Sequence, residues 1–270
     1  MPDKTVTRDS VHIEVFAEGA GPAMLLLPSL GRGVGDFSEL VPQLAAKFRV
    51  IRPQPRGIGG SRGSLSRTTL IDWAGDVAAV IDELAPEGAF VIGHAFGNFL
   101  ARCVGALWPD IVVGVGVVAG SPGRAPGRAN VYRTDIQDSI MKSSDLSLSD
   151  VDRISHLQKA FFAADSDASV WLDGWWPEVK KAQYQAYFRT PVDCFFGAGT
   201  APILQIQACE DAVAPMELAS VLSNELGSRV TTIFIEKAGH ALLPEQPDLV
   251  SHAILEWAAS IANSRKPSEG

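Results

Sequence analysis

The chain has 270 residues, of which 46% are hydrophobic and 20% charged, values that suit a soluble globular protein with one large domain or a domain with an insertion. Its net charge of −8 argues against nucleic acid as a partner, because phosphate binding needs a basic face. The longest apolar run, residues 111–119, is far shorter than the ~20 residues that span a bilayer, so no membrane partner is expected.

The first two predicted strands differ in their hydropathy patterns. Residues 11–17 alternate between apolar and polar types, which is typical of an antiparallel strand with one solvated face. Residues 24–27 are all apolar, which is typical of a strand covered on both faces. A glycine-rich loop follows, and Asp36 with Glu39 has the spacing of a capping box, so a helix is predicted from there to Phe48.

Two more strand–helix units come next. Residues 49–52 are predicted to be a strand, and Thr69 and Asp72 to cap a helix whose apolar positions follow a 3.6-residue period as far as Leu84. The apolar run 90–92 is then predicted to be a buried strand that leads through a sharp turn into an apolar helix.

That turn, Gly-His-Ala-Phe-Gly at residues 93–97, has the form of a Gly-x-nucleophile-x-Gly elbow. Such an elbow lifts its central side chain above the edge of the sheet, and its glycines let the strand and the helix approach closely. The lifted residue is Ala95, whose side chain carries no nucleophilic atom. The sequence therefore predicts the scaffold directly and the chemistry only by inference.

The alternation of strands and helices stops after a further buried strand at residues 111–119. Residues 122–199 hold 11 of the 21 Phe, Trp and Tyr residues of the chain. Linkers are poor in aromatic residues, so this stretch is predicted to be a mostly helical insertion, a cap. Residues 1–121 and 200–270 are predicted to form the core domain.

The strand–helix pattern then resumes. Residues 201–207 and 230–235 are predicted strands, and Pro215 is predicted to lie in the first turn of the helix between them. A last helix carries apolar side chains from Leu249 to Ile261 on one side. The repeated units predict an α/β fold with a mostly parallel, twisted sheet and helices on both faces, whose ligands bind at the carboxyl ends of the strands.

Two loops at that edge carry groups suited to acid–base chemistry. The loop after residues 201–207 presents Glu210 and Asp211, and the loop after residues 230–235 presents His240. A hydroxyl nucleophile needs an imidazole to take its proton, and the imidazole needs a carboxylate to fix its tautomer.

This order of elbow, acid and histidine resembles the α/β-hydrolase superfamily, in its small, capped, esterase- and lactonase-like branch, over nearly the whole chain. The resemblance implies hydrolysis of an ester or lactone bond. It places Ala95 at the nucleophile position in place of the usual serine, Asp211 at the acid and His240 at the base. The N–H groups of Leu30 and Phe96 form the implied oxyanion hole.

The resemblance also favours Asp211 over Glu210 as the acid, because Asp211 has the family's distance from the end of its strand. The chain departs from the family at two further places. Pro28-Ser29 stands where a His-Gly pair is common, and Gln54 stands where a structural aspartate is usual.

The expected substrate is small and apolar or aromatic, since aromatic residues are dense beside the expected site. The predicted substrate-binding residues are Trp171, Trp175, Trp176 and Ser29. The tryptophans could equally form a small core of the cap, and Ser29 could stand in for the nucleophile or simply shape its loop. Arg32 is expected to be a solvated loop arginine.

Three hypotheses account for Ala95. In the first, Ala95 is an engineered replacement of the serine in an otherwise intact hydrolase, made to trap a substrate. In the second, alanine is native and His240 with Asp211 acts as a general base, in non-covalent hydrolysis, lyase chemistry or cofactor-free oxygenation. In the third, the protein is a non-catalytic binder of a small apolar ligand.

No metal and no cofactor are expected. Gly31 to Gly35 lacks the spacing of a dinucleotide-binding loop, and Cys103, Cys194 and Cys209 lack the spacing of metal ligands. The cysteines are predicted to be buried small apolar residues, which fits a reducing cytoplasm. A small-molecule substrate is the expected partner, and a homodimer is left open.

Overall fold

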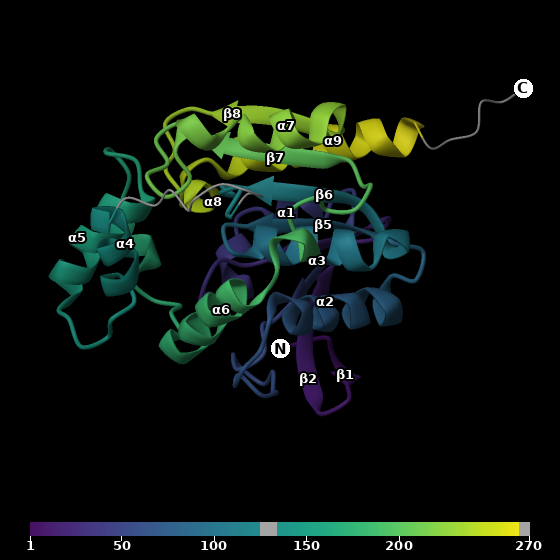
Figure 1. The fold of residues 1–270 in the computed structure, drawn as a ribbon, viewed down its shortest axis with the longest axis horizontal. Coiled ribbons are helices and arrows are strands. Elements are labelled where there is room, and N and C mark those ends of the chain that lie inside the picture. The colour runs from purple at the N-terminus through teal and green to yellow at the C-terminus, as the bar shows by residue number, and fades with distance from the viewer. Residues whose placement is uncertain (125–133, 265–270) are drawn as a thin grey trace, which may run out of the picture.

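A computed structural model describes residues 1–124 and 134–264, with side chains as far as Ile261. Residues 125–133 of the predicted cap and residues 265–270 of the predicted core lie outside the described residues. The described chain forms one sheet with helices on both faces and a lobe of helices beyond the carboxyl ends of the parallel strands (Figure 1).

Eight strands make up the sheet, in the order β1-β2-β4-β3-β5-β6-β7-β8. β1 and β2 pair antiparallel, as do β2 and β4, and all other neighbours pair parallel. The strands are β1 Lys4–Arg8, β2 Val11–Glu18, β3 Ala23–Leu27, β4 Arg49–Pro53, β5 Ala89–His94, β6 Val112–Val118, β7 Ile203–Ala208 and β8 Val230–Ile235. The predicted mostly parallel α/β fold is confirmed.

The predicted strands recur in the structure with bounds that shift by at most two residues at either end. Continuous apolar runs become buried central strands, as in β3 and β5, in which every residue is buried. No strand is predicted at β1, because Val6 is its sole buried side chain and its neighbours are polar. β1 forms a strand because its backbone pairs with β2, and a hydropathy pattern gives no information on such pairing.

Helices cover the sheet on two sides. α1 and α9 share one apolar cluster with the sheet, and α2, α3 and α7 share the other. The α-helices are α1 Val41–Leu44, α2 Leu70–Leu84, α3 Gly97–Leu107, α4 Thr134–Lys142, α5 Asp150–Phe161, α6 Pro177–Arg189, α7 Val221–Leu226, α8 Leu242–Glu245 and α9 Pro247–Ser264.

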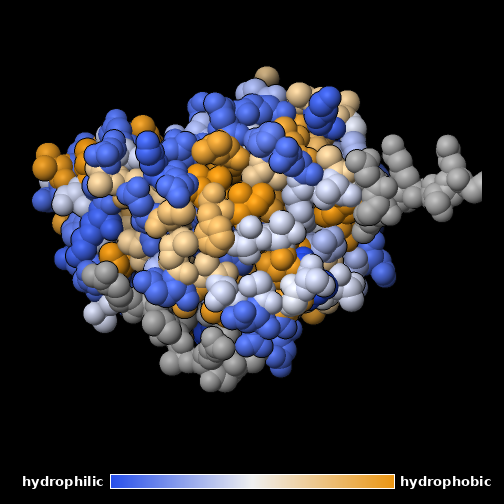
Figure 2. Space-filling view, turned by 90° about the horizontal axis from the view of Figure 1, so that it is seen from above, coloured by the Kyte–Doolittle hydropathy of each residue, from blue (hydrophilic) through white to orange (hydrophobic). Residues whose placement is uncertain are grey.

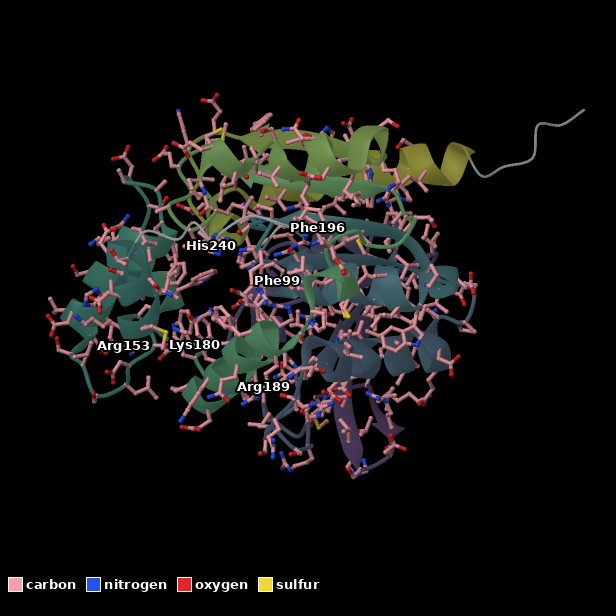
Figure 3. All side chains as sticks on the ribbon, viewed as in Figure 1. Phe99, Arg153, Lys180, Arg189, Phe196 and His240 are labelled. Carbon is pink, nitrogen blue, oxygen red and sulfur yellow. The ribbon has the colours of Figure 1, made fainter. Side chains whose placement is uncertain are left out.

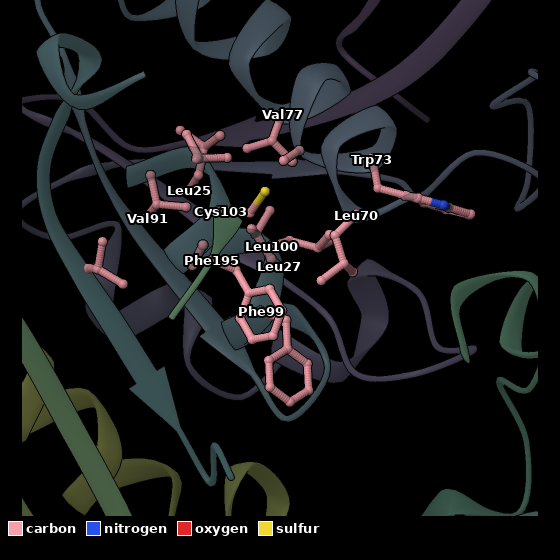
Figure 4. Packing of buried hydrophobic residues seen from close by; sticks show 14 of the residues in the cluster. Leu25, Leu27, Leu70, Trp73, Val77, Val91, Phe99, Leu100, Cys103 and Phe195 are labelled. Atoms are coloured by element: carbon pink, nitrogen blue, oxygen red, sulfur yellow. The ribbon is translucent and has the colours of Figure 1, made fainter. Parts of the chain in front are cut away.

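Figure 4 shows the second of these clusters at close range. Leu25, Leu27 and Val91 of the central strands pack with side chains of the elbow helix α3, among them Phe99 and Leu100. This packing fixes α3 against the sheet, and with α3 it fixes the position of the elbow.

The capping box at Thr69 is confirmed. The Thr69 hydroxyl accepts from the N–H of Asp72, and the Asp72 carboxylate accepts from the N–H of Thr69 at 2.7 Å. The capping box predicted at Asp36 and Glu39 is wrong. Residues Val34–Phe37 form a short 3₁₀ turn, because the Asp36 carboxylate binds Arg32 instead of a backbone N–H.

Two helix bounds also need correction. The helix predicted to reach Phe48 ends at Leu44. Pro215 precedes a 3₁₀ turn, Met216–Leu218, and α7 begins only at Val221. In both places the apolar residues pack on the core. Turns and short helices that bury the same residues give a helix-like spacing in the sequence although no continuous helix forms.

The described part of the predicted cap contains α4, α5 and α6, which contribute to different apolar clusters. Residues of α5 and of the segment that follows it form one cluster with Ala241 of the core, against which Ile140 of α4 packs. α6 joins the main core instead, through Val179, Ala182, Ala186 and Tyr187. In Figure 1, α4 and α5 accordingly lie apart from the sheet, whereas α6 lies toward α2.

Among the described residues, no helix combines the length and the apolar character that crossing a bilayer requires. All three cysteines are free thiols. Cys103 is buried as predicted, but Cys194 and Cys209 are only half-buried, which corrects the prediction for those two.

β8 is one of the two edge strands of the sheet, and β1 is the other. Figure 2 views the molecule from the side of β8 and shows hydrophobic residues gathered near the middle of the face, with hydrophilic residues around them. Phe234 of β8 and Met216 contribute exposed apolar surface. The homodimer left open by the sequence stays a prediction.

Candidate active site

The elbow lies between β5, which ends at His94, and α3, which begins at Gly97. Ala95 has a φ of 49°, in the left-handed region that a sharp strand-to-helix turn requires. A Cβ atom at Gly93 would overlap the carbonyl of Gly97, and one at Gly97 would overlap the carbonyl of Leu27. The two glycines therefore let three backbones meet, and Ala95 is held at the carboxyl edge of the sheet.

His240 and Asp211 meet at the same edge. The Nδ1 atom of His240 lies 2.9 Å from Oδ2 and 3.1 Å from Oδ1 of Asp211, and both side chains are buried. The N–H groups of Val213 and Ala214 donate to Oδ1 of Asp211 at 2.8 and 2.7 Å. Because a carboxylate accepts from Nδ1–H, Nε2 of His240 is left as the basic atom.

Glu210 points elsewhere. Its residue is exposed, and its carboxylate accepts from the N–H of Ala164 at 3.5 Å. Of the two neighbouring acids, the structure thus brings Asp211 to the histidine.

His94 forms a hydrogen bond to the backbone of His240. It is fully buried, its Nε2 donates to the backbone carbonyl of His240 at 2.8 Å, and burial lowers the pKa of its imidazole to about 3. His94 is therefore neutral and carries its proton on Nε2, since a carbonyl oxygen only accepts. It positions the His240 backbone without adding a charge to the site.

A cavity of about 110 Å³ lies in front of the elbow. Ala95, His240, Leu30, Phe96 and Ser29 all border it. Most of the remaining wall is apolar or aromatic and includes Phe99, Ile140, Met141, Phe161, Trp175, Tyr184, Tyr187 and Phe188. Figure 3 shows His240 and Phe99 on the core side of this region and Lys180 on the α6 side.

The two predicted oxyanion-hole residues border this cavity together. Among the described residues, neither the N–H of Leu30 nor that of Phe96 donates a hydrogen bond. Both backbone polar groups of the next residue, Gly31, form hydrogen bonds with the cap. Its N–H donates to Oε1 of Gln183 at 2.7 Å, and its carbonyl accepts from the N–H of Trp176 at 2.9 Å. Helix α6 therefore fixes the loop whose Leu30 N–H is left available.

We expect Gln183→Met to lower the free energy of unfolding by about 1–3 kcal/mol, because the buried N–H of Gly31 would lose its acceptor. Urea unfolding measures the change. Gln185→Met, two residues along α6 and exposed, is the control and is expected to change stability by less than about 0.5 kcal/mol. Equal unfolding midpoints for the two variants would contradict the role given to Gln183.

The four predicted substrate-binding residues divide into two pairs. Ser29 and Trp175 border the cavity at the elbow. Trp171 and Trp176 do not, and border a separate hollow that also includes Gly33. Trp171 instead packs on the ring of His94, with ring centroids 5.9 Å apart.

The expectation that Arg32 is solvated is wrong. Its guanidinium is buried between the rings of Trp171 and Trp175, 4.6 and 4.7 Å from their centroids. It forms a two-pronged contact with the Asp36 carboxylate and donates to the carbonyl of Asp173 at 2.8 Å. The i, i+4 spacing of Arg32 and Asp36 was visible in the sequence, but their burial depends on the tryptophans.

Several lining residues were missed by sequence reasoning. Lys180, Tyr184 and Tyr187 of α6 follow the i, i+4, i+7 spacing of one helix face, and this is the signal that could have found them. Phe161 ends α5 and packs on His240 with ring centroids 5.7 Å apart. No cluster of metal-ligating side chains occurs among the residues that the structure describes.

Residues 24–253 match the model of the Alpha/beta hydrolase family, which is most of the chain. The chain belongs to this family. A protein assigned as the carbamate hydrolase RutD of Variovorax paradoxus is 24% identical over 278 aligned residues, covering 96% of this chain and 99% of the relative.

A second relative matches over a shorter stretch. The 2-(acetamidomethylene)succinate hydrolase of Mesorhizobium japonicum is 29% identical over 112 residues, which is 42% of this chain and 40% of that protein. Among solved structures, the enol-lactonase of Burkholderia xenovorans LB400 superposes with a TM-score of 0.75 at 17% identity, over 95% of this chain and 100% of that one. This structural likeness shows the α/β-hydrolase fold.

Proposed function

We propose that this hydrolase-family protein cleaves an ester or lactone bond in a small apolar or aromatic substrate. The observation that carries the proposal is the buried contact of His240 with Asp211 beside a largely apolar cavity. His240 is the base, Asp211 holds its tautomer, and the N–H groups of Leu30 and Phe96 are the donors for the oxyanion.

With alanine at position 95, water is the nucleophile. Nε2 of His240 takes a proton from water as the water oxygen bonds to the carbonyl carbon, and the carbonyl oxygen becomes the oxyanion between the two N–H groups. When the tetrahedral species collapses, the carbon–oxygen bond to the leaving group breaks, and the leaving oxygen takes the proton from His240. An ester gives an acid and an alcohol, a lactone gives a single hydroxy acid, and neither reaction forms a covalent enzyme intermediate.

The relatives support this choice of bond. Two of the proteins to which the chain is similar are described as an enol-lactonase and a hydrolase of 2-(acetamidomethylene)succinate, and a third is assigned to carbamate hydrolysis. Each of these relatives is described as a hydrolase or lactonase, and addition of water to an acyl carbon is a step that an imidazole and an oxyanion hole assist.

We expect His240→Asn to reduce hydrolysis of phenyl acetate and dihydrocoumarin by about 10²–10⁴-fold, because general-base assistance would be lost. The measurement is release of phenol, and of acid from the lactone. His252→Asn is the control, since His252 lies exposed on α9. Hydrolysis that is the same in the His240 variant as in the unchanged chain would overturn the proposal.

A second candidate is favoured by Ala95 itself. A dyad without a nucleophile can abstract an acidic proton of the substrate, as in lyase or cofactor-free oxygenase chemistry. Exchange of a substrate C–H for deuterium in heavy water, without hydrolysis and dependent on His240, distinguishes this reaction. Tight binding of a ligand recovered unchanged would instead favour a non-catalytic binder.

A further inference from the structure

Lys180 is a buried lysine that the reaction proposed above does not use. Its residue is 3% exposed, on the side of α6 that faces the oxyanion-hole loop. The ammonium donates to the hydroxyl of Ser144 at 2.6 Å and to the carbonyl of Ile140. It also lies 5.0 Å from the ring centroid of Trp175.

Lys180 borders two hollows, the cavity at the elbow and a second one that its partner Ser144 and Asp145 also border. Ile140 and Trp175, two of its neighbours, border the same cavity as His240 and Ala95, and so does Lys180. Among the described lining residues there is no other lysine or arginine and no aspartate or glutamate. Lys180 is thus the one lysine or arginine among the described residues of this wall.

Some other buried cations of the described core have carboxylate partners, whereas the buried guanidinium of Arg102 donates to the amide oxygen of Asn98 and to backbone carbonyls. Arg32 meets Asp36, and Arg56 meets Asp76, each at 2.6 Å. Among the described residues, no carboxylate lies within ion-pair distance of Lys180. Two neutral oxygens compensate its charge only in part, and burial lowers the pKa of its ammonium to about 7.

A purely structural contact between α6 and α4 does not require a charge at this place. A glutamine or methionine would fill the volume without the cost of removing an ammonium from water. No carboxylate of the described chain balances the charge of Lys180. Lys180 lies in the wall of the cavity that is expected to hold the substrate. A negative group on the ligand would complete the pair.

We propose that Lys180 binds a carboxylate of the substrate, so that the substrate is a small apolar or aromatic acid. This inference rests on the proposed function for the bond that is cleaved and adds the class of substrate. The carboxylate lies against Lys180 and Trp175 at one part of the cavity, and the ester or lactone carbonyl lies at the elbow near His240.

The test is a binding measurement on the full chain with two probes of nearly equal size, 4-fluorobenzoate and 4-fluorobenzamide. They differ in charge, and ¹⁹F NMR titration gives a Kd for each. We expect the carboxylate to bind at least about tenfold more tightly than the amide, as a charge-assisted contact predicts. Equal affinities, or no binding of the carboxylate, would overturn the proposal.

Substitutions at position 180 test whether Lys180 causes the preference for the carboxylate probe. Lys180→Met is expected to remove the preference for the carboxylate, and Lys180→Arg to keep it. Lys181→Met, at the next and exposed position of α6, is the matched control and is expected to change neither Kd. A carboxylate preference that persists in Lys180→Met would contradict the assignment, and the comparison of the two probes on the unchanged chain decides the matter even if that variant does not fold.

The binding test of Lys180 and the hydrolysis test of His240 are independent of each other. The probes contain no bond to be hydrolysed, so their affinities do not depend on His240 acting as a base. If Lys180 fails to select the carboxylate, hydrolysis of neutral esters still stands or falls with the His240 variant.

Discussion

Ala95→Ser is expected to raise kcat for phenyl acetate by about 10²-fold or more and to introduce a burst of phenol equal to the enzyme concentration. The hydroxyl would stand on the elbow, at the edge of the cavity that His240 also borders, and His240 would take its proton. Serine fits the backbone there, because Ala95 already holds the left-handed φ of 49° with a Cβ atom present.

The size of the gain follows from chemistry elsewhere. In subtilisin, loss of the serine costs about 10⁶-fold in kcat, while the oxyanion hole and substrate binding retain part of the acceleration. A hydroxyl placed at position 95 with no other change to the cavity is expected to give a smaller gain. Stopped-flow measurement of phenol and mass spectrometry of the acyl adduct report the two effects.

The combined variant Ala95→Ser, His240→Asn is the control and should show neither the gain nor the adduct, since the hydroxyl would lack its base. A gain that survives loss of His240 would contradict the dyad as the source of catalysis. No gain across aryl esters and lactones would argue that the elbow does not serve acyl chemistry, and would favour proton abstraction or simple binding.

Asp36→Asn is expected to lower the free energy of unfolding by about 3–5 kcal/mol. The Asp36 carboxylate neutralises the buried guanidinium of Arg32 through contacts of 2.6 and 2.9 Å, and the two side chains are only 4% and 6% exposed. Removing the negative charge leaves a buried cation between two tryptophans. Urea unfolding followed by tryptophan fluorescence measures the loss.

A matched control lies on α4. Lys142 and Asp138 form an i, i+4 ion pair at 2.9 Å with both side chains about half exposed. Asp138→Asn is expected to cost less than about 1 kcal/mol, because water screens and replaces the contact. The double variant Arg32→Met, Asp36→Leu should recover much of the lost stability, since it removes both charges together. Similar costs for the two aspartate variants would contradict the importance of burial.

The Arg32 pair also connects the two halves of the site. Arg32 lies one residue after Gly31, whose peptide is held by Gln183 and by the N–H of Trp176. The guanidinium adds contacts from the same loop to Trp171 and Trp175. The loop that carries the Leu30 N–H is therefore fixed by residues more than 130 positions away in the chain, as in the contact of Arg32 with the carbonyl of Trp171.

Most of the fold could be predicted from the sequence because its signals are local. The continuous apolar residues of β3 and β5 indicate central strands, and Thr69 with Asp72 marks the start of α2 within four residues of chain. Local signals failed where tertiary contacts competed for the same groups. The Asp36 carboxylate could either cap a helix or pair with Arg32. It pairs with Arg32, because the guanidinium of Arg32 is buried against the tryptophans and needs a negative partner there.

The order of chemical groups along the chain was enough to predict which residues meet at the elbow. Parallel strands bring their carboxyl ends to one edge, so Ala95, Asp211 and His240 had to lie near one another once the strands were assigned. Whether Asp211 or Glu210 contacts the imidazole depends on a single turn of backbone, in which the N–H groups of Val213 and Ala214 orient the Asp211 carboxylate.

The sequence by itself determined all the strands except β1, their order in the family pattern and the alanine on the elbow, because each of these is a property of contiguous residues. The tertiary structure alone decided what surrounds Ala95. It placed Trp175 at the cavity and Trp171 and Trp176 away from it, and it brought Lys180 into the wall. The packing of α6 on the core sets these positions, together with its hydrogen bonds to α4. That packing depends on the fit of two surfaces that are distant in the chain, which no local pattern of residues predicts.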